Sequence, residues 1–115
     1  MKAFLLLAAL GCLPAAASAA GCTESYQQCV RYKNGSVAGE GGCTVSKCPT
    51  ASGGSLSWKL KDGSAVSVET DGKTGKTLVN KKPGGQVKNS TAAGMGLTCY
   101  AADEDKGEQF CVTAY

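Results

Sequence analysis

The sequence predicts a small, β-rich domain stapled by disulfides, either all-β or α+β with one short N-terminal helix, and built from antiparallel hairpins. Three observations support this. Six cysteines follow residue 20, two stretches alternate apolar and polar residues around turn-forming sequences, and the 115-residue chain contains no histidine. An even cysteine count in a short chain with a secretion signal is typical of a disulfide framework, which supplements a small hydrophobic core.

The first twenty residues have the three parts of a secretory signal peptide. Lys2 is positively charged, residues 3–13 are apolar, and residues 15–20 are small. The apolar run is too short to cross a bilayer, which takes about 20 residues. We therefore expect residues 1–20 to be removed and residues 21–115 to form a single secreted domain.

Cys12 lies within this leader and would be lost with it. An alternative is that the Ala-Leu-Gly-Cys sequence ending at Cys12 is a bacterial lipoprotein box, in which the cysteine is lipidated. Loss with the leader is preferred because it leaves an even number of cysteines. The six that remain are predicted to pair in three disulfides: Cys22, Cys29, Cys43, Cys48, Cys99 and Cys111.

The first segment of the domain has two interpretations. A short helix is predicted over residues 24–33, with Thr23 as its cap and Asn34-Gly35 as its end. The alternation of Val30 and Tyr32 also permits a strand.

Several connecting segments are expected to lack regular structure. Residues 35–42 are rich in glycine and predict a flexible loop, and Cys43 to Cys48 predicts a tight turn. Thr77 to Asn80 predicts a short strand. Residues 81–96 are polar and rich in glycine, and they predict a long mobile loop.

The strongest hairpin signal is a pair of alternating apolar stretches around an Asp-Gly sequence. A two-residue turn there would place the two apolar sets on opposite faces of the sheet. A three-residue loop over residues 61–63 instead pairs Trp58 with Val66 and Leu56 with Val68. It also puts a glycine at the left-handed position of a type I turn with a bulge, so we prefer it.

A second hairpin is predicted from residues 97–101 and 110–115. Cys99 and Cys111 lie symmetrically in it and could bond across the strands, or each could reach back to the N-terminal cysteines. We favour at least one long-range link, because a lean core gains more from it. Six cysteines allow fifteen connectivities, among which sequence cannot choose.

We expect the chain not to be an enzyme and to hold no metal or cofactor. Without histidine it lacks the commonest general base and the commonest metal ligand. The carboxylate cluster Asp103 to Asp105 lies on a predicted loop tip, where no pocket is indicated. The run Asp71 to Thr77 ends like a phosphate-binding loop, but it lacks the required earlier glycine and a strand-to-helix context.

Charge and short motifs bear on partners. Without Lys2, eleven basic and nine acidic residues remain, a net charge of +2. We expect no nucleic-acid binding, no stable membrane insertion, and a monomer. Asn34 and Asn89 begin Asn-x-Ser/Thr sequons in predicted loops, so both are candidate N-glycosylation sites in a eukaryotic source.

The layout as a whole resembles the small secreted cysteine-rich effectors of plant-associated fungi. The features that carry this resemblance are the alanine-rich leader, the short chain after it, six cysteines and no catalytic set. The resemblance implies a non-enzymatic protein, in the host apoplast or host cytoplasm, that binds a host protein or cell-wall component and suppresses defence during plant colonisation.

A second, local resemblance covers less than a third of the chain. Cys22 to Cys29, followed by Tyr32-Lys33-Asn34 and by Lys47-Cys48-Pro49, is similar to the start of the small cationic antifungal proteins of moulds. The fifty residues between Cys48 and Cys99 depart from that pattern. This resemblance implies a secreted antimicrobial or toxin-like protein as the alternative function, and a small hydrolase or hydrolase inhibitor is a further one.

Overall fold

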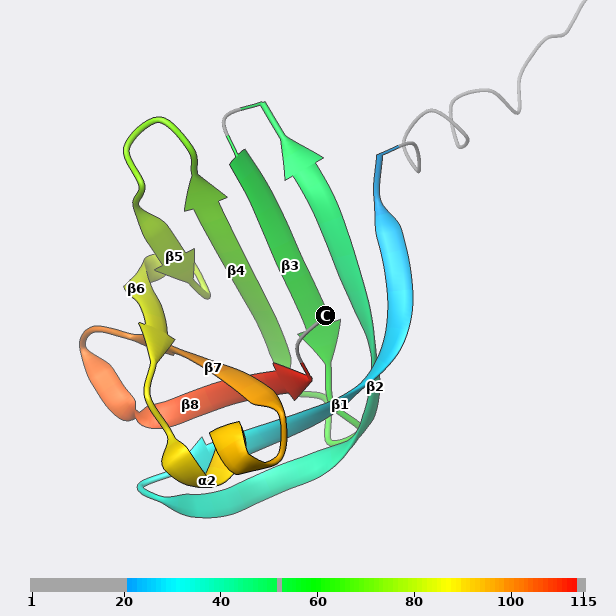
Figure 1. The fold of residues 1–115 in the computed structure, drawn as a ribbon, viewed down its shortest axis with the longest axis vertical. Helices are drawn as coiled ribbons and strands as arrows, with labels where there is room; N and C mark the ends of the chain where they lie inside the picture. Colours follow the sequence, from blue (N-terminus) through cyan, green and yellow to red (C-terminus); the bar gives the residue numbers. More distant parts are fainter. Residues whose placement is uncertain (1–20, 52, 114–115) are drawn as a thin grey trace, which may run out of the picture.

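The computed structural model describes residues 21–51 and 53–113, which form an antiparallel β-barrel of eight strands with one short helix (Figure 1). The prediction of a β-rich domain with disulfides is confirmed. The leader and Cys12 lie outside the described residues. The elements are β1 (Thr23–Lys33), β2 (Ser36–Thr50), β3 (Gly53–Lys59), β4 (Ala65–Asp71), β5 (Thr77–Val79), β6 (Lys82–Val87), α2 (Ser90–Gly94), β7 (Leu97–Ala102) and β8 (Asp105–Thr113).

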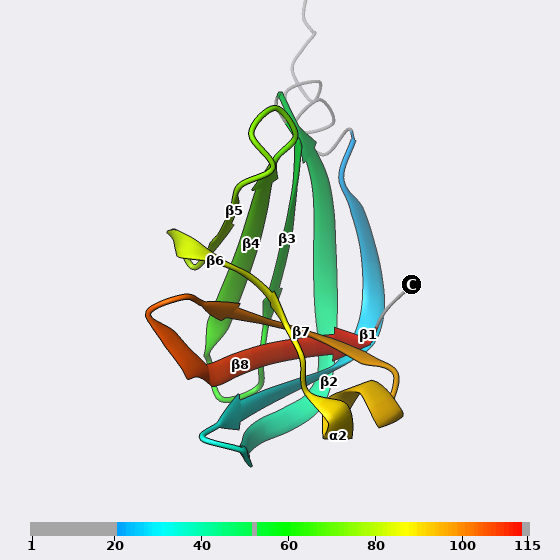
Figure 2. The same cartoon turned by 60° about the vertical axis from the view of Figure 1, so that its left-hand side comes forward.

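The strands pair in sequence order, and β8 returns to β1 to close the barrel. Only Cys29–Lys33 of β1 pairs with β8, whereas the whole of β1 pairs with β2. We call the part where β1, β7, β8 and α2 meet the closed end. Beyond it the sheet continues as the open end (Figures 1 and 2). The open end consists of the N-terminal half of β1, the C-terminal half of β2, and β3, β4 and β5.

The predicted helix over residues 24–33 is wrong, and the strand alternative is correct. Cys29 faces the barrel interior, while Val30 and Tyr32 belong to a cluster on the outer side. A strand can bury both of its faces in this way because successive side chains point to opposite sides. Asn34-Gly35 is a hairpin turn and not a helix end, with φ of 52° and 87°, as a type I′ turn requires.

The predicted loop over residues 35–42 and the predicted turn from Cys43 to Cys48 are also wrong, because β2 begins directly after Gly35 and contains both segments from Ser36 onwards. The glycines of this strand accommodate its neighbours. A Cβ at Gly42 would collide with the ring and hydroxyl of Tyr26 on the facing strand. The exposed tyrosine thus lies over the glycine on the outer face of the β1–β2 ribbon.

The hairpin of β3 and β4 is confirmed in the predicted register. Trp58 pairs with Val66 and Leu56 with Val68. The loop closes with a hydrogen bond of 2.8 Å from the Leu60 N–H to the Ser64 carbonyl, and Gly63 has a φ of 93°. The short strand at Thr77 is confirmed as β5.

The predicted mobile loop over residues 81–96 is wrong, because it contains β6 and α2. The side-chain Oδ1 of Asn89 accepts a hydrogen bond of 3.0 Å from the Ala92 N–H and so caps the helix. Ala92 is fully buried against the barrel. The polar, glycine-rich composition of this segment did not predict a helix, because the residue through which α2 is buried, Ala92, is small.

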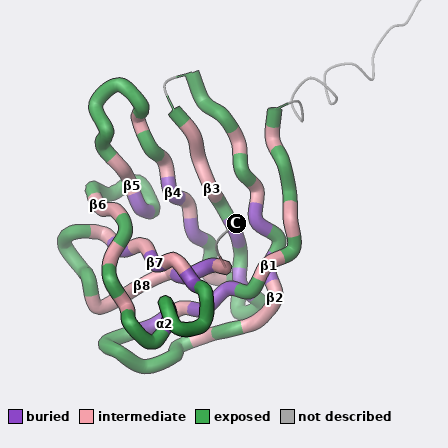
Figure 3. Tube along the Cα trace, viewed as in Figure 1, coloured by how far each residue is buried: buried purple, intermediate pink, exposed green. Residues whose placement is uncertain are grey.

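Two apolar clusters stabilise the fold, one inside the barrel and one outside it. Buried residues concentrate towards the closed end, and the tips of the open end are exposed (Figure 3). The interior cluster consists of Cys29, Cys43, Val45, Trp58, Leu60, Val66, Val68 and Val112. The outer cluster, beneath α2, consists of Val30, Tyr32, Ala92, Leu97, Cys99 and Cys111.

All six cysteines among the described residues form disulfides, and each disulfide links the two sides of one hairpin. The pairs are Cys22–Cys48, Cys29–Cys43 and Cys99–Cys111. The expectation of a long-range link is therefore wrong. The first and last strands are joined by the β1–β8 hydrogen bonds instead, so the sheet itself closes the chain into a ring.

Candidate functional site

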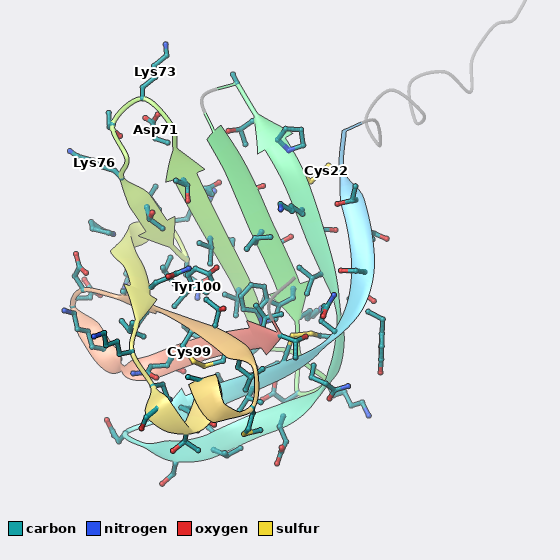
Figure 4. The ribbon with its side chains drawn as sticks, in the orientation of Figure 1. Cys22, Asp71, Lys73, Lys76, Cys99 and Tyr100 are labelled. Atoms are coloured by element: carbon teal, nitrogen blue, oxygen red, sulfur yellow. A yellow bond between two sulfur atoms is a disulfide. The ribbon has the colours of Figure 1, made fainter. Side chains whose placement is uncertain are left out.

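A hollow of about 900 Å³ lies at the open end of the barrel. Its floor is apolar, formed by Leu56, Val68 and Tyr100. Tyr100 extends from β7 into the barrel (Figure 4), and its ring centroid lies 6.3 Å from that of the buried Trp58. The walls and rim are Gly21, Thr23, Lys47, Cys48, Pro49, Gly53, Gly54, Ser55, Thr70, Thr77 and Gln86.

The strand register explains why the floor and the rim differ. Lys47 pairs with Leu56, and Leu56 pairs with Val68, so these three side chains form one row across the inner face of the sheet. The next row towards the mouth contains Gly54 and Thr70. Because side chains of one face repeat every second residue, the change from apolar to small and polar residues along β3 and β4 sets the depth of the apolar floor.

Charged side chains lie at the opposite end of the barrel. The Arg31 guanidinium lies 2.7 Å from a Glu108 carboxylate oxygen and 3.7 Å from an Asp62 carboxylate oxygen. The Ser64 hydroxyl and its backbone N–H lower the pKa of Asp62, with a smaller contribution from Arg31. These charged groups are not among the residues that line the hollow.

The carboxylates singled out in the sequence are not among the residues that line the hollow. Asp103 to Asp105 lie exposed at the β7–β8 turn. Glu104 accepts a hydrogen bond of 2.6 Å from Lys82, which raises the pKa of that lysine. This contact joins the acidic turn to the start of β6.

The run Asp71 to Thr77 connects two antiparallel strands, β4 and β5, and not a strand and a helix. Its polar side chains serve the turn, since the Asp71 carboxylate accepts a hydrogen bond of 2.9 Å from the Lys73 N–H. Lys73 and Lys76 point away from the hollow (Figure 4).

The two sequon asparagines occupy different environments. Asn34 is exposed at the β1–β2 turn. Asn89 is half-buried at the start of α2, and its Nδ2 donates a hydrogen bond of 2.8 Å to Gln109. A glycan on Nδ2 of Asn89 would therefore compete with the hydrogen bond to Gln109. Use of either sequon stays a prediction.

Residues 21–51 and 53–113 contain neither a cluster of metal ligands nor a membrane-spanning helix. No group of three or more cysteine or carboxylate side chains there could hold a metal ion. No helix of that part is long and apolar enough to span a bilayer.

Comparison with models of known protein families gave no match, and neither did comparison with curated proteins or with solved structures. Sequence reasoning missed the hollow, because its residues come from strands spread over most of the chain. The one local signal was the end of the apolar alternation at Gly54 and Thr70.

Proposed function

We propose that this chain is a secreted, non-enzymatic binding protein that holds one small, largely apolar molecule in the hollow of its barrel. The observation that supports this proposal most strongly is the hollow of about 900 Å³, which has an apolar floor and a polar rim. Ligand sites for small molecules commonly measure about 300–1,000 Å³ and combine apolar walls with a few polar groups. Eight strands enclose space for about one small ligand.

The composition of the hollow supports binding without catalysis. Among the described residues that line it, no side chain is a carboxylate and Lys47 alone carries a charge. A general acid–base pair would need a second ionisable group within reach of the same substrate atom. The three disulfides support secretion, since disulfides persist in oxidising compartments.

The resemblance to secreted effectors gives this binding activity a biological setting. In that setting the ligand is a host molecule, and its removal from the host contributes to the suppression of defence. The sequence led us to expect a host protein or a cell-wall component as partner. The hollow favours a small molecule, because an enclosed apolar floor suits a ligand that can enter it.

The test is a titration of the protein, purified from culture medium, with an environment-sensitive apolar dye. We expect one bound dye per chain. Leu56→Trp fills the hollow and should weaken binding at least about tenfold, or about 1.4 kcal/mol. Ser57→Trp is the matched control, because the neighbouring residue is exposed and points to the outer face. It should bind like the native chain.

A second variant keeps the test informative if Leu56→Trp does not fold. A Cβ at Gly54 would lie 3.6 Å from the Cys48 carbonyl, an ordinary contact, so Gly54→Leu should fold and still narrow the hollow. Absence of one-to-one binding by the native chain would refute the proposal. Equal binding by all variants would place the ligand elsewhere and refute it too.

A further inference from the structure

We infer that the hollow selects an anionic amphiphile, a molecule with one apolar tail and one negatively charged head group such as a carboxylate. This inference rests on the proposed function and adds the chemistry of the ligand. It follows from the order of apolar, neutral polar and charged groups between the floor and the mouth.

The deep part of the hollow suits an apolar tail. Val68 is 4% exposed, and Leu56 and Tyr100 are half-buried above the interior cluster. No charged side chain is among the floor residues. A polar head placed there would lose its water without gaining a charged partner, which is unfavourable.

The upper walls offer hydrogen-bonding groups on two sides. Thr23 pairs in register with Lys47 on the β1–β2 wall. Thr70 pairs in register with Thr77 on the β4–β5 wall, and their hydroxyl oxygens lie 3.5 Å apart. Hydroxyl groups can donate hydrogen bonds to a carboxylate. The polar groups therefore stand where the head of a molecule with a buried tail would lie.

The sign of the head group follows from Lys47. Its ammonium is the one charge among the described lining residues, and its aliphatic stem can lie along the apolar wall beside Leu56. A negative head near this ammonium is attracted and a positive head is repelled. Because the lysine is exposed, the attraction is modest and is screened by salt.

The experiment compares two probes with the same tail, dansyl-labelled undecanoic acid and its primary amide. Both are titrated by fluorescence at pH 7 and low salt into the protein purified from culture medium. We expect the acid to bind about fivefold more tightly than the amide, as a partly exposed charge pair would give. The preference should shrink at high salt, while amide binding changes little.

Matched variants assign the preference to Lys47. Lys47→Met keeps an apolar stem of similar length and should reduce the preference to about twofold or less, with amide affinity unchanged. Lys47→Arg keeps the charge and should keep the preference. Lys59→Met removes a charge from the outer face of β3, outside the hollow, and should behave like the native chain.

The outcomes separate this inference from the function on which it rests. Equal binding of acid and amide, or tighter binding of the amide, would overturn the inference and leave a hollow that binds neutral molecules. Failure of both probes to bind would overturn both proposals. Full preference in Lys47→Met, or its loss in Lys47→Arg, would overturn the assignment to this ammonium.

Discussion

The two ends of the barrel differ in how many faces of the sheet are covered. At the closed end, β1 and β8 are buried on both faces, by the interior cluster and by the cluster beneath α2. At the open end, the tips of the strands are exposed (Figure 3), and residues of the inner face line the hollow. The closed end thus supplies most of the buried apolar contact.

The division also follows from the pairing of a single strand. β1 hydrogen-bonds with β2 along its whole length but reaches β8 only over Cys29–Lys33. N-terminal to Cys29, β1 no longer pairs with β8, and the barrel is open there. The Cys22–Cys48 disulfide joins the two sides of the β1–β2 hairpin near that end. A disulfide here limits fraying of strands that have little packing of their own.

The largest expected effect comes from the residue where the two ends meet. Trp58 is 4% exposed in the interior cluster and contacts Tyr100 in the floor of the hollow. Trp58→Ala should lower the free energy of unfolding by about 3–5 kcal/mol, because it removes apolar contact and leaves a cavity. Denaturant unfolding followed by circular dichroism measures this. A loss below about 1 kcal/mol would contradict a shared core.

Removal of disulfides tests whether the closed end carries more of the stability. Cys99 and Cys111 are 3% and 0% exposed, so Cys99→Ala with Cys111→Ala should cost about 2–5 kcal/mol. Cys22→Ala with Cys48→Ala should cost less, although that disulfide closes a longer segment, 26 residues against 12. The chain-entropy model alone predicts the opposite order. Urea midpoints of the two double variants decide between these accounts.

The cap of α2 should have an intermediate effect. Asn89→Ala removes the hydrogen bond that Asn89 accepts from the Ala92 N–H and the one that it donates to Gln109, and should cost about 1 kcal/mol. Ser90→Ala, at the exposed neighbouring position, is the control and should change stability little. Thermal unfolding of both variants measures the difference. Equal stability of the two would mean that α2 contributes nothing to the closed end.

The smallest expected effect is a pH dependence at Asp62, in the β3–β4 loop. Ser64 lowers the pKa of Asp62 below its ordinary value of 3.8, so the folded state holds the ionised form more strongly than the unfolded chain does. The stabilisation is therefore present above about pH 4 and is lost as the pH falls through the folded pKa. Asp62→Asn should melt slightly earlier than the native chain at pH 7.

The difference between Asp62→Asn and the native chain should shrink as the pH falls through the folded pKa of Asp62, because the native carboxyl then becomes protonated as well. Melting temperatures over a pH series from 7 downwards, with Asp103→Asn at the exposed turn as control, give the comparison. A difference of the same size at every pH would contradict this account.

Local sequence predicted two hairpins, β3–β4 and β7–β8. The β3–β4 register follows from the alternation of Leu56 and Trp58 and from the turn glycine, all within a few residues of one another. Cys99 and Cys111 face each other, which is one of the two arrangements that their positions left open and not the long-range link that we favoured. Both features depend on contacts between neighbours in the chain, which composition and spacing can indicate.

Tertiary structure alone decided the rest. Residues 24–33 could form a helix or a strand by their own pattern, and the strand prevails because β2 and β8 occupy both of its edges. The helix α2 depends on the barrel surface that buries Ala92. The hollow needs strands from distant parts of the chain to curve around one space, and this arises only when β8 returns to β1. The sequence by itself therefore determined the β3–β4 hairpin and the presence of a disulfide framework, and closure of the sheet decided where the hollow lies.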